Sequence, residues 1–155
     1  MKLAEALIQR ASMKKEMDEL KSNIHLCLTV EEGETPEEGV ETLMTRFTEL
    51  INEQTELIGR INLTNATTKV ADGTFKGATL GHLIAQRDAV AQVKNQYQFL
   101  GQQTSVSRYG RTKDDVKFVL TFSPKQMREE ADKLAKQYRE LDTLIQGMNW
   151  TTDLV

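Results

Sequence analysis

The residues of this sequence best suited to nucleophilic catalysis are one cysteine and two histidines. His25 lies two positions before Cys27, and His82 is far from both along the chain. A thiol with a nearby imidazole base can act as a nucleophile. However, residues two apart on a helix do not face each other, and Cys27 falls on the apolar stripe of the first predicted helix. We therefore predict that Cys27 is a core thiol and that the chain is not an enzyme.

Carboxylates are the other potential ligands, and they cluster just before the second predicted helix. Their order lacks the Asp/Asn spacing of an EF-hand loop, and two histidines with one cysteine do not complete a zinc site. Acidic residues at a helix start are already explained by the helix dipole. No glycine-rich phosphate loop is present either. We predict no metal and no cofactor. The cluster comprises Glu31, Glu32, Glu34, Glu37, Glu38 and Glu41.

Three short segments could bind a ligand if the fold brings them together. In "SRYGRTK", two arginines flank a tyrosine, a combination that can hold a phosphate and stack on a ring, although an ordinary surface loop has the same composition. Two Asn-x-Thr tripeptides lie in "NLTNATT", and a third lies in "MNWTTDL". Such tripeptides accept sugars only in a secreted chain. The candidate residues are Asn62, Thr64, Asn65, Arg108, Tyr109, Arg111, Asn149, Trp150 and Thr151.

The Asn/Thr cluster also has a structural interpretation. Asn and Thr side chains compete for backbone hydrogen bonds, and Asn tolerates the left-handed conformation that often ends a helix. On this interpretation Asn62, Thr64 and Asn65 end the second helix, and replacing Asn65 by Val removes a helix stop. Asp72-Gly73 then follows between short β-prone segments, a pattern typical of a β-hairpin.

The apolar spacing predicts a mainly α fold, an antiparallel coiled-coil-like bundle of about four long helices with a small β element. Leu3, Ala6, Arg10, Met13, Met17, Leu20, Ile24 and Cys27 alternate spacings of three and four. The second seam runs through Val40, Leu43, Phe47, Leu50, Gln54, Leu57 and Ile61, widened by Met44, Ile51 and Ile58. The fourth helix repeats the spacing through Met127, Ala131, Leu134, Tyr138, Leu141, Ile145 and Met148.

Capping signals and breakers divide the chain further. Thr35-Pro36 and Ser123-Pro124 each begin a capping box, so helices are predicted to start at Pro36 and Pro124. "VKFVLTF" alternates like a half-buried strand. We predict one domain, 1–155, comprising a helical hairpin (1–66), a β-hairpin turn (67–78), a helix (79–102), a loop and strand (103–122) and a helix (123–148) that ends at Gly147.

Two arginines interrupt these apolar stripes. Arg10 and Arg87 stand where apolar residues are expected. A partly buried guanidinium requires a carboxylate partner, for which Glu56 and Asp88 are candidates. We predict that both arginines set helix register and take no part in catalysis.

Charge and hydropathy limit the classes of partner. The net charge is −3. Residues 1–66 carry seven basic and thirteen acidic residues, a balance of −6, whereas residues 67–155 carry thirteen and ten, a balance of +3. The net charge gives no bulk reason to expect a nucleic acid or an anionic membrane as partner. The −6 segment would itself repel RNA. No apolar run reaches the ~18 residues of a membrane span, and no signal peptide is evident. We predict a cytoplasmic location.

Three segments together resemble a known family. With "MKLAEALIQRASMKKEMDEL" at the start, "INLTNATT" after the second helix and "MNWTTDL" at the end, the chain resembles the septicolysin-like family of small bacterial helical proteins. That resemblance implies a helical protein, and the family name implies a cytolysin. The hairpin over residues 3–61 also looks like the tRNA-binding arm of seryl-tRNA synthetases, but its acidic balance opposes RNA binding.

The function predicted from these patterns is that of a non-catalytic interaction or scaffold protein that forms a homo-oligomer, a dimer or larger, with a further protein partner as an option. The first two helices are longer than the others, so the end of their hairpin should expose an apolar patch that a second copy covers. The alternatives are a septicolysin-type pore-forming cytolysin and a small-ligand or nucleic-acid binding module that uses the Asn/Thr cluster and residues 108–113. The patch comprises Leu26, Leu28, Val30, Val40, Leu43 and Met44.

Overall fold

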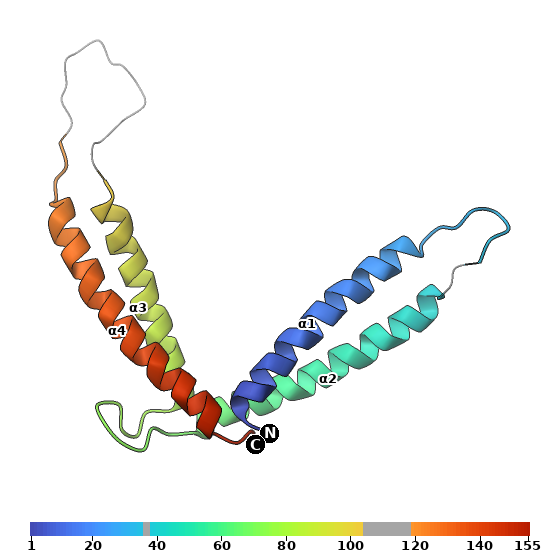
Figure 1. The fold of residues 1–155 in the computed structure, drawn as a ribbon, viewed down its shortest axis with the longest axis horizontal. Coiled ribbons are helices and arrows are strands. Elements are labelled where there is room, and N and C mark those ends of the chain that lie inside the picture. The colour runs from blue at the N-terminus through green and yellow to red at the C-terminus, as the bar shows by residue number, and fades with distance from the viewer. Residues whose placement is uncertain (36–37, 104–118) are drawn as a thin grey trace, which may run out of the picture. The chain divides into compact units, whose positions relative to one another are not determined.

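The computed structural model describes residues 1–35, 38–103 and 119–155. Within them the chain forms four helices, α1 (Leu3–Leu26), α2 (Val40–Thr67), α3 (Leu80–Gly101) and α4 (Pro124–Thr151). The chain divides into two compact units. Unit 1 comprises residues 1–81 and 146–155, and unit 2 comprises residues 82–145. The mainly α class predicted from the apolar spacing is confirmed (Figure 1).

Unit 1 is built on the antiparallel hairpin of α1 and α2 (Figure 1). The predicted seams form its core, because residues three and four apart share one face of a helix. Arg10, which interrupts the first seam, is exposed, so the expectation that it is partly buried is wrong. The two ends of the predicted first seam, Ile24 and Cys27, are only half-buried. The buried seam residues are Leu3, Ala6, Met13, Met17 and Leu20 from α1 and Leu43, Leu50, Leu57 and Ile61 from α2.

The Asn/Thr residues do not end α2, and this prediction is wrong. The helix continues through Thr67, so Asn62, Thr64 and Asn65 all lie inside it. The hydroxyl of Thr64 donates to the backbone oxygen of Arg60 at 2.8 Å, and that of Thr67 donates to Leu63 in the same way. Because these hydroxyls bond within the helix, they do not draw backbone groups out of it.

The same correction applies to the predicted end of α4 and start of α2. Helix α4 continues past Gly147 to Thr151, whose hydroxyl donates to the backbone oxygen of Gly147 at 3.0 Å. Helix α2 begins at Val40 with Gly39 as its N-cap, later than the predicted Pro36, which lies outside the described residues. The predicted start of α4 is confirmed. There the backbone N–H of Gln126 donates to the Ser123 hydroxyl at 3.4 Å.

The predicted β element is absent from the residues that the structure describes. A turn does form at Asp72-Gly73, where Gly73 has a φ of 86°, a region that favours glycine. The flanking residues make only an isolated antiparallel bridge between Lys69 and Thr79, because the segment is too short to extend a ladder. Of the predicted strand over 116–122, residues 116–118 lie outside the described residues, and residues 119–122 form no strand.

Unit 2 holds most of α3 and α4, which run antiparallel (Figure 1). Arg87 bridges them, because its guanidinium donates to Asp88 at 2.8 Å and to Asp142 at 3.1 Å. Asp88 is thus confirmed as a partner of Arg87. The hydrogen bond with Asp88, followed by that with Asp142, raises the pKa of Arg87 against the opposing effect of burial. At the other end of the pair, Arg128 donates to the backbone oxygen of Gly101.

Candidate functional site

The best-defined polar site is the junction at which both chain ends of unit 1 meet the last turns of α2. We call it the terminal junction and define it as Lys2, Arg60, Thr64, Asp153 and Val155. Its backbone is antiparallel: the N–H of residue 3 donates to the oxygen of residue 152 at 2.9 Å, and the N–H of residue 154 donates to the oxygen of residue 1 at 2.9 Å. The segment that follows α4 is thereby held against the segment that precedes α1.

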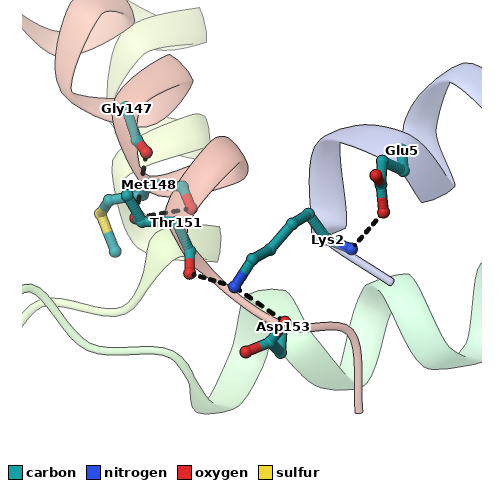
Figure 2. A network of polar contacts seen from close by, with 6 residues as sticks. All are labelled: Lys2, Glu5, Gly147, Met148, Thr151 and Asp153. Atoms are coloured by element: carbon teal, nitrogen blue, oxygen red, sulfur yellow. Dashed lines mark hydrogen bonds and ion pairs between the residues drawn. The ribbon is translucent and has the colours of Figure 1, made fainter.

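Lys2 lies at the centre of one side of this junction (Figure 2). Its ammonium group pairs with Asp153 Oδ1 at 2.8 Å and donates to the backbone oxygen of Thr151 at 3.1 Å. A cation near the last carbonyls of a helix satisfies groups that have no partner within the helix. The backbone N–H of Lys2 donates to Glu5 Oε2 at 2.7 Å, which fixes the start of α1. One residue thus connects the beginning of α1 with the end of α4.

Thr64 lies at the centre of the other side. Its side chain is fully buried, and its hydroxyl accepts a hydrogen bond from the backbone N–H of Val155 at 3.1 Å. Arg60, one turn earlier, donates through Nε to the backbone oxygen of Val155 at 2.8 Å. The two residues of α2 therefore bind both polar backbone groups of Val155. The buried Thr64 hydroxyl thus both donates and accepts a hydrogen bond within the chain, so its polar group is satisfied by the fold itself.

Asn149, near the end of α4, has a side-chain oxygen without a hydrogen-bond partner in the described part of the chain. Its side chain is 6% exposed, and among the described residues its Oδ1 is the buried side-chain oxygen that has no hydrogen-bond partner. Trp150, the next residue, is 57% exposed, so the two neighbours face different surroundings. An unpaired buried oxygen is costly in a protein interior.

The electrostatics of the junction are modest. A hydrogen bond from Lys2 and the charge of its ammonium group lower the pKa of the Asp153 carboxyl. Asp153 is 76% exposed and Lys2 is 39% exposed, so water screens their attraction. The junction contains no thiol or imidazole, and its carboxylate is already paired. Its side chains serve to hydrogen-bond backbone groups of the two chain ends.

The structure brings together some of the predicted site residues and leaves others apart. Thr64 belongs to the terminal junction, and the backbone oxygen of Thr151 accepts a hydrogen bond from Lys2 of that junction. Asn62 and Trp150 are exposed. Gly81, at the start of α3, lies so close to α2 that a Cβ there would be 3.3 Å from the Asn65 backbone oxygen. The three residues of the predicted basic loop, Arg108, Tyr109 and Arg111, lie outside the described residues.

Sequence reasoning missed Lys2, Arg60, Asp153 and Val155. Each is unremarkable in its own segment, and the partners are up to 149 positions apart in the chain. No local spacing encodes such contacts. The other residues with chemical potential stay separate: His25 is exposed and Cys27 is half-buried. Across residues 1–35, 38–103 and 119–155, no group of three or more His, Cys, Asp or Glu side chains is arranged to hold a metal ion.

Two of the hollows formed by the described residues contrast in their lining. One, of about 370 Å³, lies along the α1/α2 hairpin and is lined by charged and polar side chains, including Lys15, Glu19 and Arg46. The other, of about 610 Å³, lies in unit 2 and is mainly apolar, with Val93, Tyr97 and Met127 among its lining residues. Neither contains a buried charged group aimed at its interior, so neither carries a chemical assignment.

The apolar residues at the connected end of the α1/α2 hairpin, which we call the hairpin tip, are uncovered. Leu26 is 78% exposed, Leu28 61% and Val30 48%, and Met44 is 44% exposed on the facing helix. Two residues of the predicted patch are not exposed as expected. Val40 is half-buried, and Leu43 is 1% exposed and packs in the core. The tip therefore combines one buried anchor with four large apolar side chains in water.

These features define a mainly α protein with two antiparallel helical pairs and a polar terminal junction. Residues 10–154 match a family described as "Family of unknown function (DUF6847)", and the chain belongs to that family. A solved structure described as "Crystal structure of a functionally unknown conserved protein from Corynebacterium diphtheriae" is 35% identical, with a TM-score of 0.86. The alignment covers 100% of this chain and 99% of that one. No curated protein matches the chain.

These comparisons do not link the chain to the septicolysin-like family, so that resemblance stays a prediction. In the part of the chain that the structure describes, no helix has the length and apolar character needed to cross a bilayer.

Proposed function

We propose that this protein is a non-catalytic helical interaction protein that assembles with copies of itself through its first helical hairpin. The observation that carries the proposal is the exposure of Leu26, Leu28, Val30 and Met44 at the hairpin tip. Soluble monomers seldom expose such apolar clusters, and a larger exposed cluster usually marks a protein interface. A second copy related by two-fold symmetry is the most economical cover for it.

The remaining site features support a structural function for the rest of unit 1. The hydroxyl of Thr64 and the ammonium group of Lys2 are both engaged by backbone groups of the chain ends. These residues therefore hold the molecule together and are not available to a substrate. A non-catalytic, cytoplasmic protein is consistent with that assignment. Pore formation, the function that the septicolysin-like resemblance implies, stays an alternative, and release of dye from liposomes by the purified chain would favour it.

Light scattering on the purified chain tests the proposal. We expect a mass of two chains or more at micromolar concentration. A Leu28→Lys, Val30→Lys variant should shift the mass to one chain, because it would place unpaired charges in the interface. Ile8→Lys is the matched control, since Ile8 is 60% exposed and Leu28 61%. A native chain that is a monomer throughout this concentration range contradicts the proposal, as does an oligomer that tolerates the tip variant.

A further inference from the structure

Helix α2 carries two seams of apolar spacing, and only one of them is buried in the core of the chain. Leu43, Leu50 and Leu57 belong to the core seam. A second seam repeats the alternating three-four spacing one position further along, and most of it is exposed; Met44 is 44% exposed and Ile51 39%. Such spacing is that of the contact line between two packed helices. We call these residues the second face: Met44, Thr48, Ile51, Thr55, Ile58 and Asn62.

The second face lacks charge over about five turns of helix, from Met44 to Asn62. At about 100° per residue, the charged residues between Met44 and Ala66 all fall on a different side of α2. An ordinary surface helix places charged and polar residues over its solvent-exposed side. Here one solvent-exposed side is charged and the other is not. The charged side comprises Arg46, Glu49, Glu53, Glu56 and Arg60.

The threonines of the second face already have partners for their hydroxyl donors. Thr48 Oγ1 donates to the backbone oxygen of Met44 at 2.8 Å, and Thr55 Oγ1 donates to that of Ile51 at 2.8 Å. A buried hydroxyl without a partner is costly, but these donors are satisfied within the helix. An apolar helix can therefore cover Thr48 and Thr55 without leaving a donor unpaired.

Gly59 gives an independent indication of a close neighbour. It lies inside α2 beside the second face and is exposed, and a Cβ built on it meets no atom within 4 Å. Glycine inside a helix costs stability relative to alanine. The described part of the chain offers no close contact at this position to account for the glycine. The close approach of another helix would account for Gly59, since small residues allow two backbones to come together.

We propose that the partner on the second face is α2 of a second copy, packed antiparallel. This inference rests on the proposed self-association and specifies its surface. We align the two antiparallel helices so that Glu53 of each copy lies level with Glu53 of the other. In this register Thr48 lies opposite the partner's Ile58, and Ile51 lies opposite the partner's Thr55. Met44 then lies opposite the partner's Asn62. Every central layer thus pairs an isoleucine with a threonine, so the second face is complementary to itself.

Charge selects the antiparallel arrangement. The connection between α1 and α2 carries exposed acidic residues, including Glu31, Glu32 and Glu34. A parallel pair would place two such segments side by side, which like charges disfavour. The antiparallel pair instead places each acidic tip beside the other end of the partner's α2, where exposed Lys69 and Lys76 follow the helix. It also brings the apolar hairpin tip toward the partner's Leu63, which is 51% exposed.

Two variants test the surface by analytical ultracentrifugation. Ile51→Lys would bury an unpaired charge at the centre of the interface, and Gly59→Phe would prevent close approach of the helices. Each should raise the dissociation constant at least about 100-fold. Both positions are solvent-exposed in the single chain, so helical content measured by circular dichroism should be unchanged. Ile8→Lys on α1 is the matched control and should retain the native dissociation constant.

A cross-linking experiment tests the register. In a Cys27→Ser background, the Thr48→Cys, Ile58→Cys variant should form a disulfide-linked dimer under mild oxidation. The matched pair Arg46→Cys, Glu56→Cys, likewise ten residues apart but on the charged side of α2, should not. A native chain that is monomeric overturns the proposed function and this inference together. An oligomer that tolerates Ile51→Lys or Gly59→Phe, or that cross-links only through the charged side, overturns this inference and leaves the proposed self-association standing.

Discussion

The two ends of the α1/α2 hairpin differ in which groups they leave exposed to water. At the terminal junction, polar backbone groups of the chain ends are bound by Lys2, Arg60 and Thr64. At the hairpin tip, Leu26 and Leu28 remain in water. The chain thus satisfies its own hydrogen bonds at one end and leaves apolar surface uncovered at the other. From this difference we expect that substitutions of the junction residues alter folding, whereas substitutions of the exposed residues at the tip alter association.

The largest expected effect comes from truncating one buried side chain at each end. Ile61, near the junction, and Leu43, near the tip, are each 1% exposed. Replacing either by alanine should cost about 2–5 kcal/mol of unfolding free energy. We expect Ile61→Ala to lie toward the upper part of that range and Leu43→Ala toward the lower, because the neighbours of Leu43 are exposed and can relax around the smaller side chain. Denaturant unfolding measures both losses in the Ile51→Lys background, which we expect to be monomeric.

The informative quantity in this pair is the difference between the two losses, since the removed groups are of similar size. Equal losses, or a larger loss for Leu43→Ala, would show that the tip is as tightly packed as the junction, and the contrast between the two ends would fail.

A smaller effect is expected from the hydroxyl of Thr64. Thr64→Val preserves shape but removes the acceptor for the backbone N–H of Val155 and the donor to Arg60. The Val155 N–H, which is only part-buried, would lose its partner, at a cost of about 0.5–1.5 kcal/mol, the net contribution of an ordinary hydrogen bond. Thermal or denaturant unfolding measures the loss. Thr67→Val is the matched control, because the exposed Thr67 hydroxyl bonds only within α2, and its replacement should stay within about 0.5 kcal/mol of the native chain.

If Thr67→Val loses as much stability as Thr64→Val, the loss comes from the helix propensity of valine and not from the hydrogen bond to Val155. If Thr64→Val lowers stability without affecting self-association, the separation between the two ends of the hairpin is sharpened.

The contrast between these ends also separates what the sequence could predict from what it could not. Both core seams of the hairpin were predictable, because Leu50 and Leu57 repeat the period of a helix and that period determines which face is buried. The ends of α2 and α4 were not. Thr64 and Thr151 carry the composition of a helix stop, but their hydroxyls bond one turn back and the helices continue. Local composition cannot decide between these two uses of a hydroxyl.

The prediction of a β-hairpin was wrong for a different reason. The Asp72-Gly73 turn was correct, since Gly73 adopts the positive φ that the pattern implies. A turn does not by itself give strands, however, because a ladder needs several paired residues on each side. The terminal junction was beyond prediction altogether: Thr64 and Val155 are 91 positions apart, and only the folded chain brings them together.

The smallest effect concerns the ion pair of the terminal junction, and its sign follows from the pKa of Asp153. Lys2 lowers that pKa from its ordinary value of 3.8, so the folded chain favours the ionised carboxylate more than the unfolded chain does. The stabilisation is therefore present above about pH 4. It is lost as the pH falls through the folded-state pKa, which lies below 3.8. Asp153→Asn should lower the melting temperature slightly near neutral pH, and the difference from the native chain should vanish at strongly acidic pH.

Lys2→Met provides the matched test, because it removes the other half of the same pair, together with the hydrogen bond to Thr151. The double variant should lose less stability than the sum of the two single losses, since partners in one ion pair are not independent. Added salt should reduce the Asp153→Asn difference, because the pair is largely exposed. A difference in melting temperature that persists unchanged into strong acid would show that Asp153 stabilises the junction without its charge.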